Sequence, residues 1–296
     1  MSNESVLKAP LSIGTMRFGK WGVNMNTSDL QKLIEECLAL GLNNFDHADI
    51  YGDYTTETDF GNVLKGNFSL RDQLEIVTKC GIKMVCDNRP DYKIKSYDSG
   101  REHIITSVEN SLRNLQTDYL DILLLHRPDY LMDPHEIAEV FNELKGSGKV
   151  KNFGVSNFTT SQFHFINSFT PLVTNQVEAS ILHLNPFEDG TLDQCMMHSI
   201  APMAWSPYGG GAIFSSEQDT RTDRIKKIAE PLCQKYDCGL DQLLLAWLCL
   251  HPSGIIPVLG SSKIERIKTA LDATKIKLEK EDWYDLWQAS TGETIA

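Results

Sequence analysis

The sequence has few of the features that mark membrane-spanning, secreted or nucleic-acid-binding proteins. Its 296 residues include 28 lysines and arginines against 40 aspartates and glutamates, which gives a formal net charge of -12. Binding to DNA, RNA or an anionic bilayer needs clustered cations, so we expect no nucleic-acid or membrane partner. No apolar run reaches membrane-spanning length, and the start MSNESVLKAP is not a basic segment followed by an apolar one. These absences favour a cytoplasmic protein that acts on a small molecule.

Cysteine motifs are also missing. The seven cysteines are odd in number and scattered, without a CxxC pair. This pattern argues against a disulfide framework and against a zinc ribbon, and it indicates a reducing compartment. The GxGxxG fingerprint of a Rossmann domain is absent as well. No metal ligand is predicted.

The pattern that is present is a regular alternation of short apolar runs and amphipathic helical stretches. This order is typical of βα units in a parallel sheet, and eight strands are the number that closes a (β/α)8 TIM barrel. We find no repeat or linker, so residues 1–296 are expected to form one α/β domain. Two C-terminal helical patterns, about Lys263–Thr274 and Glu279–Ala289, are expected to fold back over the barrel. The predicted strands are Leu11–Thr15, Asn43–His47, Glu75–Lys79, Ile122–His126, Asn152–Val155, Val173–Glu178, Met203–Ser206 and Ile255–Val258.

Two longer connections interrupt this alternation. Cys80–Gly100 is a loop of about twenty residues without a clear period, and loops of this length are usually lids or binding loops. Gly209–Arg221 is a second such segment, rich in glycine and polar residues. We expect both at the mouth of the barrel.

The ends of the predicted strands bring chemically useful side chains to one mouth. Strand alternation turns Asp46 away from Phe45 and His47, so Asp46 faces the barrel interior. Tyr51, Lys79 and His126 follow or end neighbouring strands. An acid, a phenol, an amine and an imidazole in one cavity suit proton transfer to a carbonyl oxygen.

Electrostatics links these four groups. A free phenol and a free ammonium titrate near pH 10, too high for proton exchange at neutral pH. An ammonium about 4 Å from the phenol favours phenolate by on the order of 4 kcal/mol at an effective dielectric near 20, before burial opposes it. We therefore expect Lys79 to make Tyr51 a usable general acid and Asp46 to keep Lys79 charged. His126 would bind the substrate oxygen or relay the proton.

Seven strings at these strand ends resemble the aldo-keto reductases, especially a bacterial oxidoreductase branch akin to the voltage-gated potassium channel β subunits. They are DHADIYG, VTKCG, LLLHRPD, GVSNF, NQVE, AWSPYGGG and PVLGSSKIER, in that order between about Leu11 and Thr274. The resemblance implies an NADPH-dependent carbonyl reductase, with hydride supplied by a nicotinamide. It also implies that Tyr51 is the proton donor, that Lys79 and Asp46 tune it, and that His126 orients the carbonyl.

The same resemblance implies an extended cofactor site around the mouth. Ser156, Asn157 and Gln176 would hold the carboxamide, and Trp205 would stack on the nicotinamide ring. The remaining implied cofactor residues are Thr15, Met16 and Asp46 near the ring, Ser206, Pro207, Gly209 and Gly210 around the pyrophosphate, and Gly260, Ser261, Ser262, Lys263 and Arg266 at the adenosine phosphate.

The phosphate site favours NADPH over NADH. Lys263 and Arg266 are cations on adjacent helical turns of an acidic protein, which suits a 2′-phosphate. Three positions depart from the family pattern: Gly260 lacks a common lysine, Ala270 replaces an asparagine that contacts adenine, and Tyr208 replaces a leucine. NADH therefore stays possible.

Other readings remain open. The same mouth offers Asp46, His47, Asp49 and His126 to a metal-dependent hydrolase, although Lys79 is a poor neighbour for a cation and no HxH pair is present. The barrel could also be a nucleotide-binding regulatory module with incidental reductase activity. Strand alternation turns His47 away from the barrel interior, so we expect His47 to pack in the structure and to take no part in the chemistry.

Substrate and partners are less defined. The mouth loops contribute Trp21, Met25, Tyr54 and Met84, with Tyr92 or Tyr97, which predicts an aromatic-lined pocket that accepts aldehydes better than charged sugars. We expect a small carbonyl substrate, and no protein partner is evident.

Overall fold

Eight parallel strands form a closed barrel in the computed structural model, which describes residues 5–217 and 219–295. The barrel closes because β1 pairs with β2 on one side and with β10 on the other. The predicted (β/α)8 TIM barrel is confirmed, and every predicted strand is present with its ends shifted by a few residues. The barrel strands are β1 (Ser12–Gly14), β2 (Asn44–Asp46), β3 (Glu75–Cys80), β6 (Leu120–Leu125), β7 (Val150–Ser156), β8 (Asn175–Glu178), β9 (Met203–Trp205) and β10 (Ile256–Leu259).

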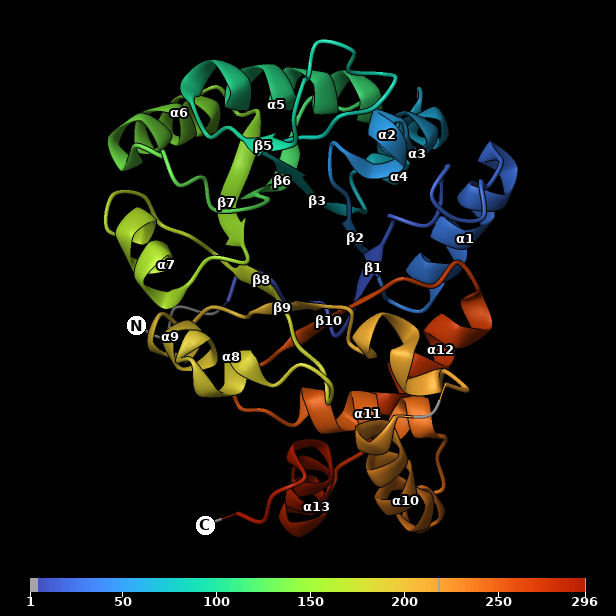
Figure 1. Cartoon of the computed structure of the whole chain (residues 1–296). Coiled ribbons are helices and arrows are strands. Elements are labelled where there is room, and N and C mark those ends of the chain that lie inside the picture. The colour runs from blue at the N-terminus through green and yellow to red at the C-terminus, as the bar shows by residue number, and fades with distance from the viewer. Residues whose placement is uncertain (1–4, 218, 296) are drawn as a thin grey trace.

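Helices surround the barrel (Figure 1). Their apolar stripes account for this position: in α1 (Thr27–Ala39), for example, Leu30, Leu33 and Ile34 are buried on one face. Asn26 caps α1, because its side-chain oxygen accepts a hydrogen bond from Asp29 N. The other helices near the barrel are α3 (Thr56–Leu64), α5 (Arg101–Leu115), α6 (Pro134–Gly146), α7 (Thr160–Asn167), α9 (Thr191–Met197), α11 (Leu240–Cys249) and α12 (Ile264–Ala273), with the short α4 (Phe68–Arg71) and α8 (Asn185–Glu188) and the long α10 (Thr220–Lys235).

The two C-terminal helices lie in the outer layer. α12 packs against α1 and α11, and α13 (Lys280–Thr291) packs against α10 (Figure 1). Trp247 of α11 and Trp283 of α13 stack with ring centroids 5.0 Å apart, and each indole donates a hydrogen bond to the other residue's backbone oxygen. Stacked rings with satisfied N–H groups hold α13 in place.

The barrel interior is apolar below the mouth and polar at it. Val77 and Ile122 belong to an inner cluster with Met203 and Val258. Lys79 lies two residues beyond Val77 on β3, so its side chain points to the same inner face, one layer closer to the mouth. Strand alternation thus places an ammonium directly above an apolar plug.

The connection Cys80–Gly100 has more structure than the sequence predicted. It contains an antiparallel pair, β4 (Ile82–Lys83) and β5 (Ser96–Tyr97), with Ile82 opposite Tyr97. The short strands left no detectable period in the sequence. No helix within residues 5–217 and 219–295 has both the length and the apolar character needed to cross a bilayer.

Candidate active site

A buried ion pair occupies the mouth between β2 and β3. The Lys79 side chain is fully buried, and its Nζ lies 2.8 Å and 2.7 Å from the two carboxylate oxygens of Asp46. Nζ also donates to the backbone oxygen of His47 at 2.7 Å. Three oxygen acceptors replace the water that an ammonium loses on burial, which lets Lys79 stay charged.

Tyr51 lies against the same ammonium. It begins α2 (Tyr51–Tyr54), the turn that follows β2, and Lys79 Nζ donates to Tyr51 Oη at 3.2 Å. The tyrosine is 9% exposed. The structure therefore brings the predicted Asp46, Tyr51 and Lys79 into one hydrogen-bonded group.

The protonation of this group depends on the balance between burial and the neighbouring charges. Burial lowers the pKa of Lys79, but Asp46 and Tyr51 outweigh burial and the net shift is upward. For Tyr51, burial raises the pKa, and the opposing effect of Lys79 does not reverse it. Desolvation of the phenolate therefore outweighs the predicted effect of the nearby ammonium. Tyr51 is a neutral phenol at physiological pH.

His126 lies across the mouth from Tyr51. It follows β6, and its ring centroid is 6.1 Å from that of Tyr51 in an edge-on arrangement. Burial, with the nearby charges of Lys79 and Arg127, holds the pKa of His126 well below 6.5. His126 Nδ1 is buried and has no hydrogen-bond partner in the described part of the chain. The imidazole is thus neutral, and its Nδ1 is an unpaired polar atom at the mouth.

A chain of hydrogen bonds extends from Asp46 to Trp205. Gln176 Nε2 donates to Asp46 Oδ1 at 2.8 Å, and the Gln176 backbone oxygen accepts from Ser156 Oγ at 2.9 Å. Asn157 Nδ2 donates to Ser156 Oγ, and Trp205 Nε1 donates to Asn157 Oδ1 at 3.0 Å. The residues predicted for the carboxamide and the ring are therefore contiguous with the proton-transfer group.

The segment after β9 has an unusual backbone conformation. Pro207 is buried, whereas Gly209, Gly210 and Gly211 all have positive φ angles. A Cβ at Gly210 or Gly211 would meet nothing within 4 Å, so backbone conformation rather than space favours glycine there. Ser206 also has a positive φ, of 52°. The N–H groups of Gly209 and Gly211 donate to the backbone oxygens of Ser206 and Tyr208, so this turn is internally hydrogen-bonded.

The segment after β10 leads into α12. Gly260 is exposed, Ser261 Oγ accepts from Lys263 N at 3.2 Å, and Ser262 precedes the helix. Lys263 and Arg266 are exposed and make no ion pair with the part of the chain the structure describes. Free cations at a helix N-terminus fit a phosphate.

Two predicted cofactor residues lie near β1. Met16 is 41% exposed. Thr15 is fully buried, and its hydroxyl lies 3.1 Å from the Asp46 backbone oxygen and 3.0 Å from His47 Nδ1. The Thr15 hydroxyl is therefore occupied by β2, and His47 packs edge-on against Phe60 as a core residue.

The aromatic wall is close to the one predicted. Trp21, Tyr54, Met84 and Tyr97 pack around Tyr51 in one cluster. Met25 is an exception, because it packs against the main core on the outside of the barrel. Asp53 and Arg127 also lie at this wall, although the sequence did not predict them. Asp53 accepts a hydrogen bond from Trp21, and Arg127 donates to the His126 backbone oxygen. The one sequence signal for these two residues is their position next to predicted ones, since Asp53 precedes Tyr54 and Arg127 follows His126.

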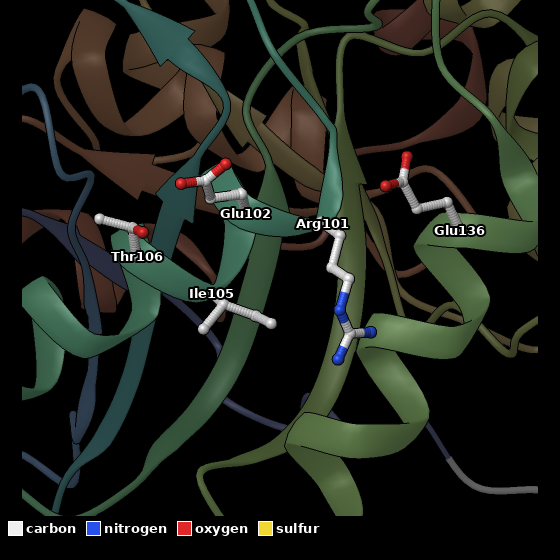
Figure 2. A pocket seen from close by; sticks show the side chains of 5 residues that line it. All are labelled: Arg101, Glu102, Ile105, Thr106 and Glu136. Carbon is white, nitrogen blue, oxygen red and sulfur yellow. The ribbon is translucent and has the colours of Figure 1, made fainter.

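Other polar clusters lie away from this chemistry. In residues 5–217 and 219–295, no three His, Cys, Asp or Glu side chains are arranged to hold a metal ion. A surface hollow between α5 and α6 contains none of the predicted site residues (Figure 2). It is lined by Arg101, Glu102, Ile105, Thr106 and Glu136.

Comparison with known proteins decides the family. Residues 10–290 match the model of the aldo/keto reductase family. The chain belongs to the aldo/keto reductase family. Membership of this family makes the protein an oxidoreductase.

Relatives extend over almost the whole chain. The uncharacterized oxidoreductase YcsN of Bacillus subtilis is 45% identical over 95% of this chain and 94% of its own length. A 6-dehydroglucose reductase of Agrobacterium fabrum is 40% identical over 98% of both chains. The crystal structure of an aldo/keto reductase from Klebsiella pneumoniae with NADP and acetate superimposes with a TM-score of 0.73, at 27% identity over 94% of this chain and 89% of that one.

The buried ion pair should be necessary for stability as a pair. We expect Lys79→Met to lower the free energy of unfolding by about 3–5 kcal/mol, because it leaves the buried Asp46 carboxylate without a cation beside it. The double variant Asp46→Asn, Lys79→Met should recover much of that loss, since no charge remains. Urea denaturation measures both. A Lys79→Met variant that unfolds at the wild-type midpoint would contradict this account.

Proposed function

We propose that this protein is an NADPH-dependent carbonyl reductase in which Tyr51 is the general acid. The observation that carries the proposal is the hydrogen bond between Lys79 Nζ and Tyr51 Oη inside a buried ion pair. A neutral phenol held by an ammonium can release its proton to an oxygen that is gaining negative charge, because the ammonium stabilises the phenolate left behind.

The residues divide the work as follows. Bound NADPH supplies the hydride that reduces the carbonyl carbon. His126, as a neutral imidazole, donates a hydrogen bond that orients the substrate oxygen. Tyr51 Oη transfers its proton to that oxygen, so the product is an alcohol. Lys79 stabilises the resulting tyrosinate, and Asp46 keeps Lys79 charged throughout.

The cofactor would lie along residues at or near the carboxyl ends of five strands. Ser156, Asn157 and Gln176 suit the carboxamide, and the Trp205 indole, fixed by Asn157, suits one face of the nicotinamide ring. Ser206, Pro207, Gly209 and Gly210 would surround the pyrophosphate, and Gly260, Ser261, Ser262, Lys263 and Arg266 the adenosine phosphate. Thr15 and Met16 would contribute from β1, Thr15 through atoms other than its hydroxyl. The NADP bound to the Klebsiella relative supports this choice of cofactor.

The substrate we propose is a small, uncharged aldehyde. Trp21, Tyr54, Met84 and Tyr97 offer flat and apolar surface beside Tyr51. The relative from Agrobacterium fabrum is a 6-dehydroglucose reductase, and its name supports an aldehyde as the reacting group.

Replacing the proposed acid should abolish turnover and spare cofactor binding. We expect Tyr51→Phe to lower kcat for NADPH-dependent aldehyde reduction by about 10²–10⁴-fold. The dissociation constant for NADPH, measured by fluorescence titration, should be unchanged. Tyr54→Phe is the matched control, because Tyr54 Oη bonds only to the backbone of Ile82 and Met84 among the described residues. Comparable losses in the two variants would overturn the assignment of Tyr51.

The pH dependence follows from the pKa shifts. His126, whose pKa lies well below 6.5, stays neutral as the pH falls through that value. Tyr51, whose pKa is raised above 10.0, stays protonated on the alkaline side. We expect kcat/KM for reduction to be nearly constant between about pH 6 and about pH 9. An inflection close to pH 6.5 that His126→Ala removes would show that the imidazole titrates in the working range.

Cofactor preference should depend on the exposed cations of α12. We expect Arg266→Ala to raise the dissociation constant for NADPH by about tenfold or more and to change that for NADH little, because only NADPH has a 2′-phosphate. Isothermal titration of both cofactors tests this. Equal losses for the two would refute a 2′-phosphate contact.

A further inference from the structure

Three loops of the barrel mouth meet at Asp53. Its Oδ1 accepts a hydrogen bond from Trp21 Nε1 at 3.0 Å, and its Oδ2 forms an ion pair with Lys20. Its backbone oxygen accepts from Asn88 Nδ2 at 2.7 Å. Asp53 therefore joins the loop after β1, the turn after β2 and the loop after β4.

The turn that contains Asp53 adopts an unusual backbone conformation. Gly52, Asp53 and Tyr54 have φ angles of 61°, 58° and 70°, and they directly follow Tyr51. Left-handed conformations are costly for residues with a Cβ, so surrounding contacts must hold them. Tyr54 supplies further contacts: its Oη lies 3.2 Å from the Ile82 backbone oxygen and accepts from Met84 N at 3.0 Å.

Of the two side chains that bond to the Asp53 carboxylate, the Trp21 indole is the one that reaches the proposed site. Its ring centroid lies 6.2 Å from that of Tyr51, and it packs on the cluster that contains Tyr51 and Ile82. Lys20 differs, because its side chain is 58% exposed and an ion pair at such a position contributes little. The bond to Trp21 is thus the one through which Asp53 can affect the substrate pocket.

We propose that Asp53 is a positioning residue that sets substrate specificity, because it holds the Trp21 indole as one wall of the pocket beside Tyr51. The fixed indole offers a flat apolar face, so the substrates that depend on Asp53 are carbonyl compounds with a ring. We expect small aliphatic aldehydes to depend on this wall less, because they bury less apolar surface against it. The inference rests on the proposed reductase function and names a determinant of its specificity.

Two variants of Asp53 separate its side-chain bonds from its backbone conformation. Asp53→Gly removes the carboxylate but tolerates a positive φ, and Asp53→Asn keeps an acceptor for Trp21 and also tolerates that conformation. Lys20→Met is the matched control, because it removes the ion pair and leaves the indole bond intact. None of these residues belongs to the proposed proton-transfer group.

Steady-state kinetics with benzaldehyde and propanal provides the first test. In Asp53→Gly, we expect kcat/KM for benzaldehyde to fall about tenfold, mainly through KM, and that for propanal to change less than about twofold. Asp53→Asn and Lys20→Met should stay within about threefold of wild type for both. The dissociation constant for NADPH should be constant. Equal losses for the two aldehydes, or no loss in Asp53→Gly, would overturn the proposal.

A double-mutant cycle tests whether Asp53 acts through the indole. Trp21→Phe removes the N–H donor, so Asp53→Gly should have little further effect on benzaldehyde kinetics in that background. Additive losses would instead show that Asp53 acts through another group, and the proposal would fail.

A measurement without turnover distinguishes this inference from the function on which it rests. The difference in fluorescence emission between the wild type and Trp21→Phe is the emission of Trp21. The corresponding difference between Asp53→Gly and the double variant Trp21→Phe, Asp53→Gly gives the emission of Trp21 without the Asp53 carboxylate. We expect acrylamide to quench the Trp21 emission more strongly in Asp53→Gly, because the indole becomes mobile. Unchanged quenching would refute the positioning role even if aldehyde reduction is observed. Increased quenching in a protein that reduces no aldehyde would sustain the positioning role and reject the reductase.

Discussion

One buried ammonium organises the mouth of this barrel. Lys79 has no exposed surface, yet its Nζ reaches the Asp46 carboxylate, the His47 backbone oxygen and the Tyr51 hydroxyl. Removing a charge from water costs several kcal/mol, and only close, well-directed oxygen atoms offset that cost. The positions of β2, β3 and the turn after β2 are therefore tied to one nitrogen atom.

Two opposing effects meet at this nitrogen. Burial raises the pKa of Tyr51, and the adjacent ammonium of Lys79 opposes that rise because it stabilises the phenolate. His126 is kept neutral by burial and by the same ammonium. A neutral donor beside a permanent cation suits a reaction in which negative charge develops on oxygen.

Much of the fold was readable from the sequence because its signals are periodic. The eight strands and the inward direction of Asp46 follow from alternation, and the resemblance across seven strand ends predicted that Gln176 and Trp205 lie near Asp46. The net effect on the pKa of Tyr51 was not readable, because it depends on how far burial outweighs Lys79. The hairpin at Ile82 and Tyr97 was missed since two-residue strands have no period. Asp53 was missed because its partners lie on two other loops, and only coordinates bring them together.

The pairing of β1 with β10 has a consequence for synthesis of the protein. Ser12 lies opposite Val258 and Ile13 opposite Leu259, so β1 finds its second neighbour only after the residues of β10 have been translated. A sheet that forms during translation keeps the free edge of β1 until then. Unpaired strand edges are sites of misassembly, so the interval before β10 is made is the stage at which this barrel is most exposed to it.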